Sequence, residues 1–114
     1  LKWLRENPVI NERTTVEYND NRISLYVAQK GKCSVTGEKL LPWEMHCHHK
    51  QLWSETKDDS YKNLTIIKPS VYRLIHTTKK ETINQLLNEL KLNEEQLDRL
   101  NKLRKLVKNE EICI

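Results

Sequence analysis

Two stretches decide the fold of this chain: Met45-His46-Cys47-His48-His49-Lys50 and the run from Lys62 to His76. The first contains a pair of adjacent histidines, which is rarer than a lone histidine, and we interpret it as a strand. Leu64-Thr65-Ile66-Ile67 is short and β-branched, so it predicts a second strand. Lys68-Pro69-Ser70 predicts a helix start, because proline is favoured in the first helical turn. We therefore expect a strand, a long polar loop over residues 51–62, a strand and a short helix.

The polar residues on these elements follow the order that a one-metal nuclease needs. Asn63 comes fourteen residues after His49, and His76 comes thirteen residues after Asn63. In such a site a histidine on the first strand acts as general base, while its neighbour and a histidine on the following helix hold a divalent cation. An asparagine between the strands ties the loop, so that the base points at the scissile phosphate. The competing interpretation is a half-exposed strand with incidental imidazoles.

Helical patterns flank this centre. Ile23, Tyr26 and Val27 lie on one helix face, which predicts a helix from about residue 21. Asp20 or Asn21 is the expected cap of this helix. Gly31 is its expected stop.

The last third of the chain has two runs of leucine at helical spacing, over residues 83–90 and 97–107. Asn93 with Gln96 between the runs resembles a capping box. Together with the two strands, these helices indicate an α+β domain.

Composition narrows the class of protein. The chain has 114 residues, which is room for one domain, with 32% charged and 37% hydrophobic residues and a mean hydropathy of −0.78. No apolar run approaches the roughly 20 residues of a membrane span. Residues 1–8 carry no secretory signal. We therefore expect a cytoplasmic protein with no membrane partner, and, because the chain begins at Leu1 and not at Met, a piece of a longer protein.

The charge suits a polyanionic partner without demanding one. Twenty basic and sixteen acidic residues give a net charge of +4 and a pI near 9.0. The residues that we expect to contact DNA surround the histidines or lie on the following helix: Lys50, Lys57, Lys62 and Arg73. In the helical tail Arg99, Lys102 and Lys105 share a face, which either tracks a phosphate backbone or is simply solvated.

Residues 33–76 resemble the HNH endonuclease motif of the ββα-metal fold. The wider stretch 18–114 is similar to the C-terminal endonuclease domain of bacterial group II intron-encoded reverse transcriptases/maturases. The segments that carry the resemblance are 21–33, 45–50, 59–64, 73–77 and 100–106. The resemblance implies an endonuclease domain over 18–114, with a core motif over 33–78 and a helical tail over 79–108. Residues 1–17 would then be a linker or the remnant of a preceding region.

The resemblance also implies a role for each site residue. His49 would be the general base, His48 and His76 would be metal ligands, and Asn63 would orient the base and its loop. The cofactor would be Mg²⁺, or Mn²⁺ or another divalent cation. The domain would nick one strand of target DNA and leave a 3′-OH primer for the linked reverse transcriptase. Its partners would be DNA, the intron RNA and the reverse transcriptase/maturase portion of the parent chain.

Tyr72 departs from the family pattern. Many relatives carry a histidine four residues before the last one, where this chain has Tyr72. The phenol, with an ordinary pKa near 10, is a poor Mg²⁺ ligand at neutral pH. Tyr72 is therefore either a ligand or, as we favour, an aromatic at the core or rim, and the site would be reduced to His48, His76 and waters. The rival function is a catalytically degenerate HNH fold that acts as a nucleic-acid-binding module.

Cys33 and Cys47 are the remaining candidates for metal binding. Many HNH domains hold a structural zinc with two Cys-x-x-Cys pairs, but here Thr36 stands where the partner of Cys33 would be. A closed zinc site needs four ligands, and Cys33, His46 and Cys47 offer three at most. We favour small buried hydrophobes over structural zinc. A zinc-knuckle interaction domain is the second rival.

Overall fold

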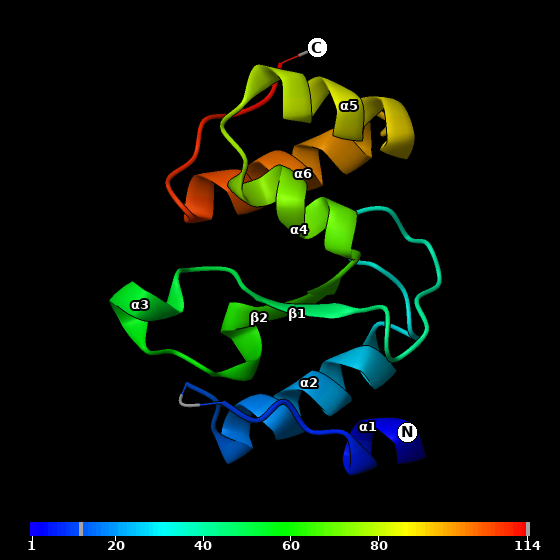
Figure 1. Cartoon of the computed structure of the whole chain (residues 1–114), viewed down its shortest axis with the longest axis vertical. Helices are drawn as coiled ribbons and strands as arrows, with labels where there is room; N and C mark the ends of the chain where they lie inside the picture. The colour runs from blue at the N-terminus through cyan, green and yellow to red at the C-terminus, as the bar shows by residue number, and fades with distance from the viewer. Residues whose placement is uncertain (12, 114) are drawn as a thin grey trace.

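The computed structural model describes residues 1–11 and 13–113 (Figure 1). The strands are β1 (His46–His49) and β2 (Leu64–Ile67). The helices are α1 (Lys2–Glu6), α2 (Val16–Ala28), α3 (Trp53–Thr56), α4 (Pro69–His76), α5 (Lys80–Leu90) and α6 (Glu94–Leu106), and a 3-10 turn, η1 (Tyr61–Asn63), precedes β2. The chain thus mixes helices with an antiparallel strand pair, as an α+β class requires. Within the described residues no helix is both long and apolar enough to cross a membrane.

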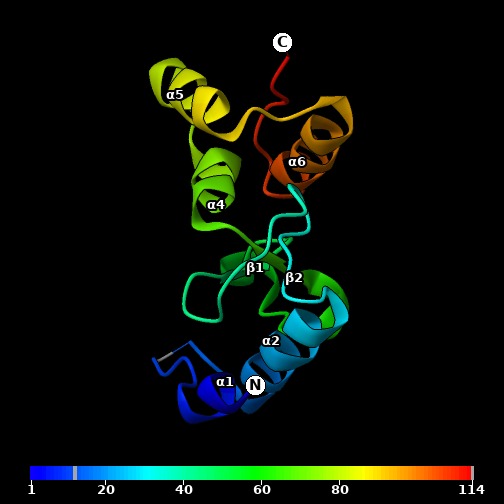
Figure 2. The same ribbon diagram turned by 90° about the vertical axis from the view of Figure 1, so that its right-hand side faces the viewer.

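The two predicted strands are confirmed, and they pair with each other. His46 lies opposite Ile67, and His49 lies opposite Leu64. Every residue of β2 is buried. The reason is visible in Figures 1 and 2, where the strand pair lies between α2 on one side and α4 with α6 on the other.

The helix after β2 and the helical tail are also confirmed. Pro69 occupies the first turn of α4, where its missing N–H is no loss because the first helical amides have no partner within the helix. Asn93 and Gln96 form the predicted capping box at the start of α6. These signals are local, and the structure realises them where the sequence places them.

Two expectations on local structure are wrong. The first long helix begins at Val16, not near residue 21, because Thr15 caps it: the Thr15 hydroxyl accepts a hydrogen bond from the Tyr18 amide at 3.0 Å. The stretch 51–62 is not a continuous loop, since it contains α3 and the start of η1. Both of those elements are too short to show an apolar period.

The first seventeen residues, expected to be a linker or remnant, are partly packed on the rest of the chain. Leu4 of α1 is fully buried. The Asn19 side chain accepts a hydrogen bond from the Val9 amide at 2.8 Å and donates one to the Val9 carbonyl at 3.0 Å. Thr15, as shown below, also supports the site. The domain boundary at residue 18 stays a prediction.

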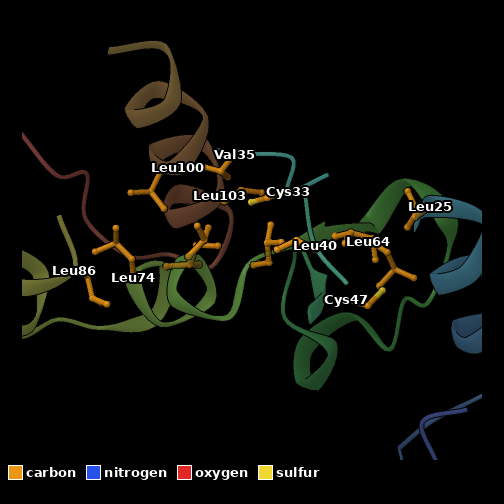
Figure 3. Close-up of a cluster of buried hydrophobic side chains, with 14 of the residues drawn as sticks. Leu25, Cys33, Val35, Leu40, Cys47, Leu64, Leu74, Leu86, Leu100 and Leu103 are labelled. Atoms are coloured by element: carbon orange, nitrogen blue, oxygen red, sulfur yellow. The ribbon is translucent and has the colours of Figure 1, made fainter. Parts of the chain in front are cut away.

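One hydrophobic core runs through the molecule from α2 to the tail. Figure 3 shows Leu74 of α4 beside Leu100 and Leu103 of α6, with Val35 and Cys33 from the turn that precedes β1. Because α4 is anchored in this core, the exposed side of the helix is held at a defined distance from β1.

Candidate active site

All four histidines of the chain line one cavity of about 430 Å³. Three come from β1 and the fourth, His76, from the last turn of α4. Tyr18, Trp53, Tyr72 and Arg13 also line it. The structure therefore brings together His48, His49 and His76, which the sequence order and the family resemblance had grouped.

His48 and His49 reach the same cavity although they are successive residues. Side chains alternate between the two faces of a regular strand. The two side chains keep this alternation: His49 stacks on Tyr18 of α2, whereas His48 lies near His76 of α4. The cavity is nevertheless lined by both residues.

His49 is held on two sides. Its Nε2 lies 2.7 Å from Oδ1 of Asp59, and its ring stacks on Tyr18 with centroids 5.3 Å apart and planes at 15°. An ionised carboxylate only accepts hydrogen bonds, so in the neutral imidazole Nε2 carries the proton and Nδ1 keeps its lone pair.

Asp59 is itself fixed by α2. The Thr15 hydroxyl donates a hydrogen bond to its Oδ2 at 2.8 Å, and the Asn21 amide donates one to its backbone carbonyl at 2.9 Å. The residue is only 5% exposed. Asp59 thus sets the orientation of His49.

The environment of His48 is the opposite of that of His49. The residue is 2% exposed, and its Nε2 is buried with no hydrogen-bond partner among the described residues. Burial, with a smaller contribution from the nearby imidazoles of His76 and His46, lowers the pKa of His48 to about 3. The ring is therefore neutral at pH 7, with the electron pair that a metal ligand needs.

His76 faces His48 across the cavity. Their ring centroids are 5.5 Å apart with the planes at 71°, and His76 is exposed to solvent. Burial against its neighbours lowers the pKa of His76 as well. One buried and one accessible neutral imidazole therefore share this side of the cavity.

The backbone that carries His76 is fixed by α6. The buried Arg104 guanidinium donates hydrogen bonds to the carbonyls of Leu74, Thr77 and Glu110. Asn109 donates to the carbonyls of Ile75 and Thr77, both at about 3 Å. These bonds satisfy the carbonyls that the end of α4 would otherwise leave unpaired. The helical tail is thus structural, and it positions a site residue.

Tyr72 packs among the histidines. Its ring centroid lies 3.9 Å from that of His46 and 4.6 Å from that of His76. Burial lowers the pKa of His46 to about 4, with repulsion from His76 and His49 adding to the effect. Within the described residues no set of three or more His, Cys, Asp or Glu side chains is arranged to hold a metal ion.

Asn63 ties the loop but does not touch His49. Its side chain accepts a hydrogen bond from the Gln51 amide at 3.0 Å and donates to the carbonyls of Gln51 at 3.3 Å and Asp58 at 2.9 Å. These bonds close both ends of the segment between the strands. Asn63 therefore reaches the base indirectly, through Asp58 and its neighbour Asp59.

Cys33 and Cys47 are buried in the core. Cys33 Sγ accepts a hydrogen bond from the Lys68 amide at 3.4 Å. Burial raises the pKa of the Cys47 thiol to about 12, which disfavours the thiolate that zinc requires. Both environments suit small apolar side chains.

The predicted DNA-binding residues fall into separate places. Lys57 lies over the ring of Trp53, which lines the histidine cavity, and Arg73 is exposed on α4. Lys50 and Lys62 line a different cavity, of about 250 Å³, with Asn63.

Two of the basic side chains on the shared face of α6 interact with other groups of the protein. The Arg99 guanidinium donates to the Val35 carbonyl at 3.0 Å, and Lys105 pairs with Glu111 at 2.5 Å. Lys102 borders a cavity that Lys50 also lines. A continuous phosphate track along this face would have to compete with those two interactions.

Sequence reasoning missed four residues at the site or beside it: Asp59, Tyr18, Arg13 and Trp53. Asp59 lies ten residues after His49 in a polar stretch where acidic residues are ordinary. Tyr18 follows the Thr15 cap by three residues, and recognising that cap would have placed Tyr18 in the first turn of a helix. Arg13 offered no local signal.

No protein-family model matches this chain and no curated protein matches it, so the comparisons identify no family for it.

Proposed function

We propose that this chain is a metal-dependent DNA endonuclease domain of the HNH type, with the ββα-metal arrangement formed by β1, β2 and α4. It would hydrolyse one phosphodiester of a target strand and leave a 3′-OH. The observation that carries the proposal is the shared cavity: His49 is oriented by a buried carboxylate, while His48, with its unpartnered Nε2, faces His76.

His49 is the group that takes the proton from the attacking water. Asp59 accepts from Nε2, so Nδ1 is the free basic nitrogen. The stacked ring of Tyr18 limits rotation of the imidazole. When water gives its proton to Nδ1, the imidazolium that forms is stabilised by the Asp59 carboxylate.

His48 and His76 suit a cation site with few protein ligands. Burial keeps the His48 ring neutral, and its Nε2 has no competing partner among the described residues. His76 is accessible from solvent. Magnesium commonly keeps several waters and takes substrate phosphate oxygens as ligands, and imidazole also suits transition metals. When bound, the divalent cation would neutralise charge on the scissile phosphate and the leaving oxygen.

The resemblance to the endonuclease domain of group II intron-encoded proteins suggests the setting. In that setting the nick would supply the primer for a linked reverse transcriptase in the bacterial cytoplasm. Intron RNA and the remainder of the parent chain would be partners. The net charge of +4 suits such nucleic-acid partners.

A plasmid-nicking assay with Mg²⁺ or Mn²⁺ tests the proposal. Wild type should convert supercoiled plasmid to the nicked form, and His49→Ala should lose roughly 10²-fold or more of that rate. Lys80→Ala, an exposed position on α5, is the control and should nick like wild type. Equal nicking by wild type and His49→Ala would overturn the enzyme.

A second candidate is a degenerate HNH fold that binds nucleic acid without cutting it. The observation in its favour is Tyr72, whose ring fills the space between His46 and His76. A Tyr72→His variant separates the two functions. If wild type binds DNA but does not nick, and Tyr72→His does nick, the site is an HNH centre that has lost a ligand.

A further inference from the structure

Arg13 and Lys57 gather at one aromatic ring, although they come from distant segments. The Arg13 guanidinium carbon lies 5.8 Å from the centroid of the Trp53 indole, and the Lys57 ammonium lies 3.9 Å from it. Arg13 precedes α2, whereas Trp53 begins α3 and Lys57 is the C-cap residue that follows it. Cation–π attraction to indole is the strongest that a protein ring offers, so both cations have a reason to stay there.

The charges of the two cations are uncompensated among the residues that the structure describes. Among the described residues no carboxylate forms an ion pair with Arg13 or Lys57. Glu55, on the same short helix as Trp53, instead pairs with Lys108 at 3.3 Å. Both cations are exposed. Both are therefore available for charge-assisted hydrogen bonds to an anion that reaches the ring.

The ring that holds these cations belongs to the histidine cavity. Trp53 and Arg13 line it together with His48, His49 and His76. A phosphodiester strand whose scissile phosphate lies against the histidines would therefore have further phosphates beside Trp53. Guanidinium and ammonium groups are the usual phosphate ligands, and Arg binds two phosphate oxygens at once.

We propose that Arg13 and Lys57, supported by Trp53, form a clamp for a DNA phosphate adjacent to the scissile one. This clamp rests on the proposed nuclease function for the identity of the strand, and it adds a binding element from the segment 1–17. Trp53 is a positioning residue in it, because its indole faces the cations and the phosphate would contact only the cations.

The test measures binding without cleavage. The full chain is titrated into a short fluorescein-labelled DNA duplex in EDTA, and the anisotropy is followed over a range of NaCl concentrations. Log K falls as log[salt] rises, and each lost phosphate contact makes this negative slope shallower by about 0.9. Arg13→Gln and Lys57→Gly should each weaken binding and make the slope shallower by about that amount. The control, Lys80→Ala, removes one positive charge from α5 and should leave the slope unchanged.

The choice of glycine at residue 57 guards against unfolding. Lys57 has a backbone φ of 52°, which glycine adopts more easily than lysine does. Lys57→Gly should therefore keep its thermal midpoint while it loses DNA affinity. Trp53→Leu should also weaken binding, although it removes no charge.

The outcomes separate this clamp from the proposed chemistry. If wild type fails to nick but both cation variants show the expected reduction in salt dependence, the clamp stands and the nuclease function falls. If wild type nicks while Arg13→Gln and Lys57→Gly bind DNA with the slope of wild type, the clamp is overturned and the nuclease function stands.

Discussion

His48 and His49 are neighbours in sequence, yet the fold treats them in opposite ways. His49 is partly accessible, hydrogen-bonded to Asp59 and stacked on Tyr18. His48 is almost fully buried, and its Nε2 has no partner among the described residues. The protein therefore fixes the proton position on one imidazole and leaves the electron pair of the other for a ligand from outside.

In the proposed function, one short strand would serve two chemical roles. A base needs a fixed orientation and a group that stabilises its protonated form, which Asp59 supplies. A metal ligand needs a neutral ring with an uncommitted nitrogen, which burial supplies for His48. The two regions have different supports as well, because α2 holds Asp59 and α6 holds the end of α4.

The largest expected effect is on the nicking rate, and it concerns His49 and its partner Asp59. Asp59→Asn can present an amide N–H to Nε2 of His49 and favour the wrong tautomer, so the nicking rate should fall by roughly 10²-fold or more. Asp58→Asn is the matched control, since the Asp58 carboxylate accepts from the Ser60 amide and not from His49. Comparable losses in the two variants would remove the special role of Asp59.

The next effect concerns the end of α4, which carries His76: Arg104→Met should destabilise the fold. It leaves the carbonyls of Leu74, Thr77 and Glu110 without their donor, so the free energy of unfolding should fall by roughly 2–4 kcal/mol. Urea unfolding measures this change. Lys102→Met, at an exposed position of the same helix, should stay within about 0.5 kcal/mol of wild type. If Arg104→Met also stays within that margin, α6 does not anchor α4.

Acid should destabilise the protein through the buried imidazoles. Burial lowers the pKa of His48 to about 3 and that of His46 to about 4, from 6.5 in the unfolded chain. Below about pH 6.5 the unfolded chain binds protons that the folded chain does not, so the free energy of unfolding falls as the pH falls. Each histidine contributes a slope of up to about 1.4 kcal/mol per pH unit.

The measurement is urea unfolding at several pH values between about 7 and 5, above the range in which carboxylates titrate. Replacing His48 by leucine should make the decline shallower. An identical pH dependence in wild type and His48→Leu would show that His48 is not held neutral by burial.

The smallest expected effect is on the free energy of unfolding, and it has opposite signs at His48 and His49. In the metal-free protein His48→Leu removes a buried polar atom that lacks a partner, and should raise the free energy of unfolding by about 1 kcal/mol. His49→Leu leaves the buried Asp59 without its imidazole partner, and should lower it by about the same amount or more. Thermal unfolding in EDTA compares them. A loss of stability in both variants would contradict this difference between His48 and His49.

Much of the fold followed from local signals. The β-branched residues of β2, Pro69 at the start of α4 and the Asn93–Gln96 capping box each act within a few residues of chain, and all three appear where they were predicted. The start of α2 did not follow, because several capping residues compete there. Thr15 has the advantage that its side chain also bonds Asp59, 44 residues away.

In the candidate site, too, some features followed from the sequence and others did not. The sequence determined by itself which residue types could perform the proposed chemistry, and His48, His49 and His76, which it grouped, line one cavity, whereas Asn63 lines another. Only the tertiary structure decided that Asp59 orients His49, that Arg104 anchors α4, and that Arg13 and Lys57 meet on Trp53. The physical reason is that hydrogen bonds and cation–π contacts act over a few ångström in space, whatever the separation along the chain, and leave no periodic signal in it.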